Sequence, residues 1–172
     1  MKILFFTVFV LFVVTSGFAQ NNEKRSRKEI KGEQKSQKTQ QIKTAIENKS
    51  FVFKAQSVVP MNEMTKTLTS DFGIEVRNDS IYSYMPYYGN IYSRDYSSFK
   101  NSPMGFMQPI ESYKKVKTKA GYDVNIKVKN SNDVIGLVFH IAKTGEASVV
   151  ASSINRQSIS YMGEILISQP DK

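Results

Sequence analysis

The feature that most limits how this chain can fold is a two-residue alternation of apolar and polar side chains. Between Tyr122 and Lys129 an apolar residue occupies every other position, and polar or charged residues stand between them. Successive side chains of a β-strand point to opposite faces, so this pattern predicts a strand with one buried and one solvated face. Antiparallel sheets commonly have one face in water.

The same alternation recurs along most of the chain after Lys49. Short clusters of Asn, Asp, Ser and Gly separate the alternating segments, and they predict tight turns between neighbouring strands. Seven to eight short strands joined in this way predict a mostly β fold, an antiparallel barrel or sandwich, and periodicity leaves that choice open. The predicted strands are 51–60, 72–77, 80–84, 122–129, 134–141, 147–152 and 158–167, with a bulge expected at Gly163.

One helix is predicted before the first strand, over residues 36–48. Ser36 can act as its N-cap, and residues 37–47 contain no helix breaker. A narrow apolar stripe at i, i+3, i+4 spacing is formed by Ile42, Ala45 and Ile46. We expect this stripe to pack on the β structure.

Residues 20–35 precede that helix and are polar, with mixed charge. They hold too few apolar side chains to offset the entropy lost on ordering, so we predict a flexible basic tail. The net charge of +9 is concentrated near this tail, because residues 20–49 contain nine Lys or Arg and four Glu. The remainder, residues 36–172, is predicted to be a single β domain that includes the helix.

The first nineteen residues have the pattern of a cleaved signal peptide. Lys2 supplies a positive start, residues 3–14 are apolar except for Thr7, and small residues follow. This predicts cleavage between Ala19 and Gln20. The alternative is a membrane anchor, but a spanning helix needs about 20 apolar residues. We therefore expect a periplasmic or secreted protein that keeps no transmembrane segment after cleavage.

The chain has no cysteine. Exported proteins often depend on disulfides, so the stability of this domain must come from packing and backbone hydrogen bonds. The absence also excludes thiol nucleophiles, thiolate metal sites and a lipid anchor on a cysteine. Export makes nucleic acid an unsuitable partner.

No constellation of catalytic or metal-binding residues stands out. His140 is the single histidine, and zinc sites combine several His or Cys ligands. A Ser-His-acid triad around His140 is formally allowed, but no G-x-S-x-G motif supplies its serine. We expect no cofactor, no metal and no enzymatic activity.

The densest cluster of unusual residues runs from Tyr82 to Phe106. It contains six of the nine tyrosines, with Pro86 and Gly89 interrupting any strand. Tyrosine offers a rigid apolar face and a hydroxyl, which suit sugars and protein partners. The alternative is that these rings cover one end of a barrel or an open sheet face. As a tentative ligand or partner surface, beside a concavity, we select Tyr87, Tyr88, Tyr92 and Tyr96.

Several segments, in order, resemble an exported Bacteroidetes-type family catalogued as domain of unknown function 4251 (DUF4251). The resemblance covers Ile42 to Ile167, with Met85 where the family usually has Leu. It implies no assigned activity and no known catalytic residues. Many members look like lipoproteins, from which this cysteine-free chain departs. The segments that carry the resemblance are 48–55 (NKSFVFKA), 59–61 (VPM), 68–71 (LTSD), 79–89 (DSIYSYMPYYG) and 155–164 (NRQSISYMGE).

Three functional hypotheses follow from these observations. The first is a non-enzymatic envelope binding module that holds a small hydrophobic or glycan-like ligand near the tyrosines. The second is a structural or assembly protein that contacts another envelope component. The third, which the sequence supports least, is a hydrolase with an unrecognised site.

Overall fold

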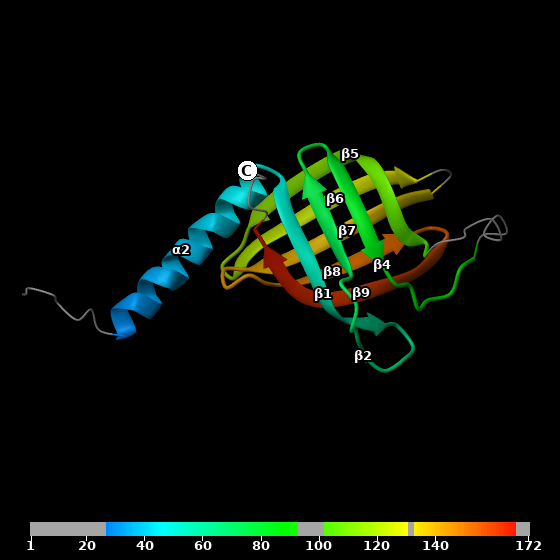
Figure 1. The fold of residues 1–172 in the computed structure, drawn as a ribbon. Coiled ribbons are helices and arrows are strands. Elements are labelled where there is room, and N and C mark those ends of the chain that lie inside the picture. The colour runs from blue at the N-terminus through cyan, green and yellow to red at the C-terminus, as the bar shows by residue number, and fades with distance from the viewer. Residues whose placement is uncertain (1–26, 93–101, 131–132, 168–172) are drawn as a thin grey trace, which may run out of the picture. The chain divides into compact units, whose positions relative to one another are not determined.

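The computed structural model describes residues 27–92, 102–130 and 133–167, apart from the side chain of Lys28. The chain divides into two compact units, residues 1–33 and 34–172. The elements, shown in Figure 1, are α2 (Arg27–Glu47), β1 (Ser50–Pro60), β2 (Lys66–Thr67), β3 (Gly73–Arg77), β4 (Ser80–Met85), β5 (Met104–Lys117), β6 (Gly121–Asn130), β7 (Asp133–Ala142), β8 (Glu146–Ser153) and β9 (Arg156–Leu166).

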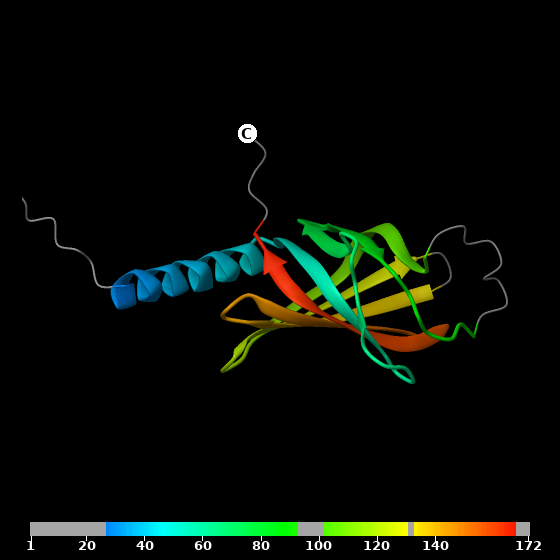
Figure 2. The ribbon, with the colours of Figure 1, turned by 60° about the horizontal axis from the view of Figure 1, so that its bottom comes forward.

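The strands form a closed antiparallel barrel. From β3 to β9 each strand pairs with the next, and β1 pairs with β3 on one side and β9 on the other, as Figure 2 shows from a second direction. Phe53, for example, lies opposite Ile74 of β3 and Ile165 of β9. This closure makes an eight-stranded barrel, and the two residues of β2 extend the pairing of β1. The predicted mostly β fold with one N-terminal helix is confirmed, as a barrel.

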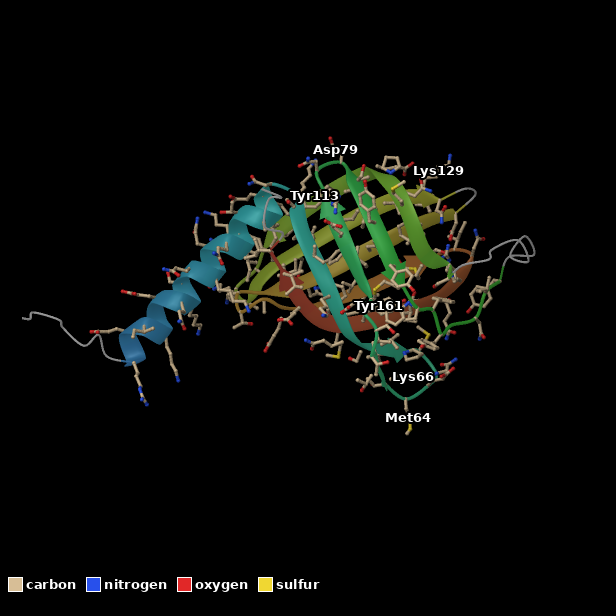
Figure 3. The ribbon with its side chains drawn as sticks, in the orientation of Figure 1. Met64, Lys66, Asp79, Tyr113, Lys129 and Tyr161 are labelled. Atoms are coloured by element: carbon tan, nitrogen blue, oxygen red, sulfur yellow. The ribbon has the colours of Figure 1, made fainter. Side chains whose placement is uncertain are left out.

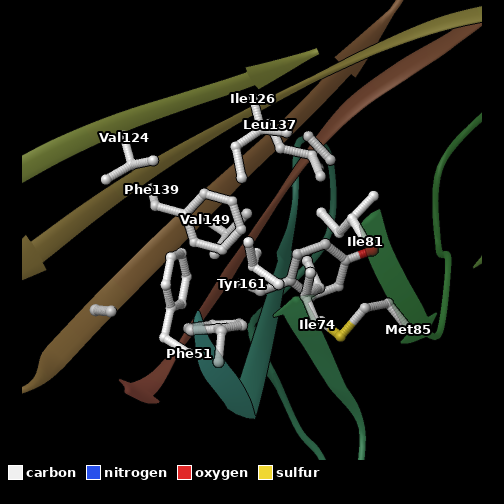
Figure 4. Packing of buried hydrophobic residues seen from close by; sticks show 14 of the residues in the cluster. Phe51, Ile74, Ile81, Met85, Val124, Ile126, Leu137, Phe139, Val149 and Tyr161 are labelled. Carbon is white, nitrogen blue, oxygen red and sulfur yellow. The ribbon is translucent and has the colours of Figure 1, made fainter. Parts of the chain in front are cut away.

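The barrel interior is filled by apolar side chains. Figure 4 shows rings and branched side chains from opposite walls meeting at the centre. Phe139 packs edge-on against Phe51, with ring centroids 5.7 Å apart, and against Phe53 at 6.2 Å. All three are fully buried. Burial of this kind is the main favourable contribution to folding, and here it replaces the absent disulfides.

Two predicted boundaries are corrected by the structure. The helix begins at Arg27 rather than at Ser36, which therefore lies inside the helix and is not its N-cap. Residues 27–35, predicted as flexible tail, are rich in Lys, Glu and Gln, which favour helices. At the other end, the helix stops at Glu47, and Lys49 takes the left-handed conformation (φ 52°) that commonly ends helices.

Strands β2 and β5 were not predicted. In β5 the alternation is broken by Pro109 and by an irregular register between Ile110 and Ser112. The first part of β5 pairs with β4 and the later part with β6, so the strand turns from one neighbour to the other. The expected bulge at Gly163 lies instead on the partner strand, where Gln56 is the extra residue opposite it.

The apolar stripe of the helix packs on the barrel core as predicted. Ile42, Ala45 and Ile46 are all buried. The hydroxyl of Tyr113 donates a hydrogen bond of 2.8 Å to the carbonyl of Ile46, which satisfies a carbonyl in the last turn of α2. No helix in the described ranges is long and apolar enough to cross a membrane.

Candidate functional site

The segment after β4 is tied to the beginning of β9. Ile91 forms an isolated antiparallel bridge with Arg156, and the amide of Tyr92 donates to the carbonyl of Asn155 at 2.8 Å. The Gln157 amide donates to the Asn90 carbonyl at 2.9 Å. Below this segment, the hydroxyl of Tyr161 donates to the Pro86 carbonyl at 2.7 Å. The breakers in the sequence therefore mark a segment held in place by backbone and side-chain hydrogen bonds.

Tyr87 has a structural place in that segment. Its hydroxyl lies 2.7 Å from the Gln157 carbonyl and 2.9 Å from the Asn90 carbonyl. The ring is half-buried against the core cluster. A Cβ atom at Gly89 would lie 2.5 Å from the Tyr87 hydroxyl, so the glycine makes room for this ring. Tyr87 is one of the four tyrosines selected from the sequence as a ligand surface. Its surroundings instead match the alternative interpretation, in which the rings cover one end of the barrel.

The other selected tyrosines differ in their surroundings. Tyr88 is 39% exposed, and the ammonium group of Lys66 lies 4.4 Å from the centre of its ring. Tyr92 is 64% exposed. Tyr96 lies outside the described residues, so the concavity predicted to include it stays a prediction.

A second aromatic surface, which the sequence analysis did not single out, lies on the outer wall of the barrel. On β4 the inward positions are Ile81, Ser83 and Met85, so Tyr82 and Tyr84 point outward. Met107 of β5 lies directly opposite Tyr82 and is also exposed. We call the outward residues Tyr82, Tyr84 and Met107, together with Phe72, which is partly buried against the core, the outer aromatic face.

Tyr84 is the most accessible ring of this face, at 69% exposed. Its cross-strand neighbours are both glycines, Gly73 on β3 and Gly105 on β5. Cross-strand neighbours normally cover part of each other's surface, so these glycines leave the flanks of the ring uncovered. Phe72 stacks on Tyr84 with ring centroids 5.4 Å apart and planes at 28°. This contact holds one tyrosine ring in a fixed orientation.

The charges next to the outer aromatic face are balanced. Arg77 lies over the Tyr82 ring at 5.2 Å and pairs with Glu75 at 2.5 Å. Lys54, in the same outward row as Tyr84, pairs with Asp71 at 2.9 Å. This hydrogen bond and the lysine charge lower the pKa of Asp71. Each of these cations has a carboxylate partner, so the surface around the rings is close to neutral.

His140 lies on the outer wall, as its strand position predicts. Its Nδ1 is 2.9 Å from Oδ1 of Asp123, and in the sheet register it stands between Asp123 on β6 and Ser148 on β8. The structure records no hydrogen bond between His140 and Ser148. A hollow of about 480 Å³ contains all three, together with Glu146 and Met162. The row has the residue types of a triad, but its serine is not connected to the histidine.

A groove of about 580 Å³ lies along α2 and is lined mainly by uncharged polar side chains. Its walls include Gln37, Gln40, Gln41 and Asn48, and Ile167 lies at its edge. Among the described residues no titratable side chain lines this groove, and these residues therefore offer it no acid-base chemistry. In the described part of the chain no group of three or more His, Asp or Glu side chains is placed to hold a metal ion.

The outer aromatic face could not be recognised from hydrophobicity alone. In β4 the more apolar side chains would be expected to face the core, and the structure shows the opposite. Tyr82 and Tyr84 are more apolar than Ser83, yet Ser83 is the buried residue. Its hydroxyl donates a 2.6 Å hydrogen bond to the Met104 carbonyl, which makes burial of this small polar side chain acceptable. The sequence signal that could have identified the buried face of β4 is the pair Ile81 and Met85, because these apolar residues lie on the same face as Ser83.

Comparison with known proteins identifies a family. The family model described as domain of unknown function (DUF4251) matches residues 33–165. A crystal structure of a DUF4251 family protein from Bacteroides eggerthii DSM 20697 superposes with a TM-score of 0.57 at 15% identity, covering 76% of this chain and 87% of that chain. At this identity the likeness concerns the fold. No curated protein matches the sequence. Since the family model spans most of the chain, this protein belongs to the DUF4251 family.

Proposed function

We propose that this protein is an exported, non-enzymatic binding module of the cell envelope, and that its outer aromatic face holds an uncharged, glycan-like ligand. The single observation that carries the proposal is the environment of Tyr84. This ring is 69% exposed, has glycine on both neighbouring strands, and is stacked on Phe72. Tyr82 and Met107 are exposed on the same face, and a contiguous exposed apolar patch of this kind marks a contact surface.

The balanced charges favour a neutral ligand. The outer aromatic face is bordered by the pairs Arg77–Glu75 and Lys54–Asp71, so it has no excess charge to attract a polyanion or a polycation. The cations of these pairs can donate hydrogen bonds to the hydroxyl groups of a ligand, and the carboxylates can accept hydrogen bonds from them. Aromatic rings flanked by such groups suit the apolar face and hydroxyl rim of a sugar ring.

The enzymatic alternative has weaker support. In the row Asp123–His140–Ser148 the serine lacks the hydrogen bond that would activate it. Half of the His140 side chain is exposed on the outer wall, where water is not excluded from a reaction. We interpret this row as a polar patch of the wall, and His140→Ala is expected to leave ligand binding unchanged.

The binding proposal is tested with two variants of matched exposure. Tyr84→Ala and Tyr92→Ala each remove an exposed ring, 69% and 64% accessible, but only Tyr84 belongs to the outer aromatic face. Retardation of the purified mature protein in gels that contain neutral polysaccharides measures the affinity. We expect Tyr84→Ala to weaken binding about tenfold, as loss of about 1.4 kcal/mol of stacking would, and Tyr92→Ala to bind as the parent does.

Three results would contradict the proposal. Equal losses in both variants would show that the ligand depends on Tyr92 as much as on Tyr84 and is not held by the outer aromatic face. Retention of binding by Tyr84→Ala would remove the outer aromatic face from consideration. If no polysaccharide binds, and the protein isolated from its native envelope carries a protein partner that Tyr84→Ala no longer retains, the assembly function replaces the glycan-binding function.

Export is tested separately. The signal-peptide pattern of residues 1–19 lies outside the described residues and supports a periplasmic or secreted location. N-terminal sequencing of the protein recovered from its own host is expected to begin at Gln20. A mature chain that keeps Ile3 to Val14 would show that the segment is an anchor.

A further inference from the structure

The basic side chains of the strands differ in whether a carboxylate pairs with them. Those on the first strands and in the barrel end are paired with carboxylates, namely Lys49 with Asp79, Lys54 with Asp71, Lys66 with Glu63, Arg77 with Glu75, and Arg156 with Asp133. The hairpin formed by β5 and β6 is different. No carboxylate among the described residues forms an ion pair with the lysines at its turn end, which are Lys114, Lys115, Lys117 and Lys119.

These lysines lie on an ordered hairpin. Lys117 is the last residue of β5 and lies opposite Tyr122 of β6. In the turn, the Thr118 amide donates to the Gly121 carbonyl at 2.9 Å, and the Gly121 amide donates to the Thr118 hydroxyl at 3.0 Å. The backbone amide of Lys143, in the turn after β7, donates to the Ala120 carbonyl at 3.1 Å. The hairpin end is therefore braced from the neighbouring strands.

An exposed apolar residue lies between the lysines. Val116 is 56% exposed, and it points to the outer wall because it lies opposite Asp123, whose neighbour Val124 is buried. Lys114, Lys115 and Lys117 lie beside it along the strand, distributed over both faces of β5, and are exposed. We call these four residues and Lys119 the lysine hairpin. Val116 is the one exposed apolar side chain in this short run of lysines at the end of the hairpin.

The carboxylates near this end do not neutralise the lysine hairpin. Asp123 is engaged with His140 at 2.9 Å, and Glu146 lies in the same hollow as Thr118 and Ala120. Four hairpin lysines, with Lys143 in the adjacent turn, outnumber these two carboxylates. The contrast with the balanced outer aromatic face is direct, because Met107 of that face and the lysines occupy opposite ends of β5.

We infer that the lysine hairpin docks the protein on the surface of an anionic lipid bilayer. Each lysine near such a surface strengthens the attraction about fivefold, and the effect decreases within about 10 Å at moderate salt. Val116 can enter the boundary between head groups and acyl chains, as apolar side chains do in interfacial segments. A soluble polyanion would use the lysines but would gain nothing from an exposed valine. The inference does not depend on the identity of the ligand on the outer aromatic face.

The test uses the full mature chain and three matched double variants. Lys117→Gln with Lys119→Gln removes two charges from the lysine hairpin. Lys127→Gln with Lys129→Gln removes two exposed, unpaired lysines from the far end of β6, where Figure 3 shows Lys129. Lys24→Gln with Arg25→Gln removes two charges from the N-terminal tail. Sedimentation with vesicles of phosphatidylcholine, with and without 30% phosphatidylglycerol, measures the fraction bound.

We expect binding only to the vesicles that contain phosphatidylglycerol, with strong weakening by 0.5 M salt. The hairpin double variant should lower the partition coefficient about 25-fold, from about fivefold for each lysine. The control on β6 should change it less than about twofold, and so should the tail variant. Val116→Ser should also lower the partition coefficient on vesicles that contain phosphatidylglycerol, but it should not change the binding of inorganic polyphosphate.

Several outcomes would overturn the inference. These are equal losses in the hairpin and β6 variants, a loss confined to the tail variant, or equal binding to neutral vesicles. Polyphosphate binding as strong as vesicle binding, with Val116→Ser indistinguishable from the parent on both, would assign the hairpin to a soluble polyanion. Circular dichroism of each variant shows whether the barrel is intact, which is expected because the substituted side chains on the strands and in the turn are exposed.

Discussion

Arg156 and Asp133 form an ion pair inside the end of the barrel, with 2.6 Å between Nη2 and Oδ2. Both side chains are more than nine-tenths buried. Arg156 Nη1 also donates to the Pro103 carbonyl and lies 3.8 Å from the sulfur of Met104. The other oxygen of the carboxylate, Asp133 Oδ1, has no hydrogen-bond partner among the described residues. The arginine therefore connects the beginnings of β5, β7 and β9 through a single side chain.

Removing only the arginine is expected to be strongly destabilising. Arg156→Met leaves the Asp133 carboxylate buried without its counter-charge, which typically costs about 3–5 kcal/mol. The double variant Arg156→Met with Asp133→Leu has no uncompensated charge and is expected to be more stable than Arg156→Met alone. Urea unfolding of the parent, both single variants and the double variant measures the coupling. Additive effects would mean that the pair is not coupled.

The stripe of α2 gives a matched comparison within one helix. Ile46→Ala removes a fully buried side chain and is expected to cost about 2–5 kcal/mol. Ile30→Ala makes the same chemical change where the side chain is 40% exposed, and it is expected to cost less than about 0.5 kcal/mol. Thermal unfolding distinguishes them. Similar melting temperatures for the two variants would show that the helix does not contribute to the core.

Two glycines are expected to respond in opposite directions to the same substitution. A Cβ atom at Gly163 would lie 2.0 Å from the carbonyl oxygen of Lys54, so Gly163→Ala must displace β9 from β1. A Cβ atom added at Gly32 in α2 would meet no atom within 4 Å outside the local helix backbone. Gly32→Ala is therefore expected to stabilise the helix by up to about 1 kcal/mol. Melting temperatures check the two signs, and a neutral Gly163→Ala would contradict the close approach.

Alkaline pH is expected to unfold the protein through its buried tyrosines. Burial raises the pKa of the Tyr161 hydroxyl, and burial also raises that of Tyr113. Above about pH 10 the unfolded chain loses these protons while the folded chain keeps them, so stability is complete below pH 10 and falls as the pH rises further.

The control for this pH dependence is Tyr161→Phe. It loses the hydrogen bond to Pro86, at a cost of about 1 kcal/mol at neutral pH, but should show a smaller fall in melting temperature between pH 9 and 11. A parent protein whose melting temperature does not change over that range would show that Tyr161 ionises in the folded state.

Most strands could be predicted because their burial follows a local period. For β6, alternation from Tyr122 to Lys129 records which side of the strand faces the core. In β5 the alternation does not indicate the buried side, because Pro109 and the irregular register near Ser112 shift the period. In addition, the lysines near the end of β5 are exposed on both faces of the strand. The start of α2 was missed for a related reason. No buried side chain marks residues 27–35, and only helix propensity describes them.

The candidate sites were harder to predict because they depend on pairings between distant residues. The Phe72–Tyr84 stack and the glycines beside Tyr84 lie on three different strands. The pair Arg156–Asp133 joins residues on β9 and β7, and nothing in either local sequence indicates the partner. Barrel and sandwich differ only in whether β1 meets β9, a relation that no local pattern contains.

The contact between β1 and β9 also determines when the chain can finish folding. Residues such as Val52 and Leu166, or Pro60 and Ile159, must find each other across about a hundred intervening residues. Pairings of such long range slow folding, because the entropy of closing the chain is lost before the contact is gained. Until β9 arrives, β1 and β8 each expose a row of unpaired backbone groups that can pair with another chain. A nascent or truncated chain that ends before Arg156 is therefore an open sheet prone to aggregation, and the last strand completes and protects the domain in one step.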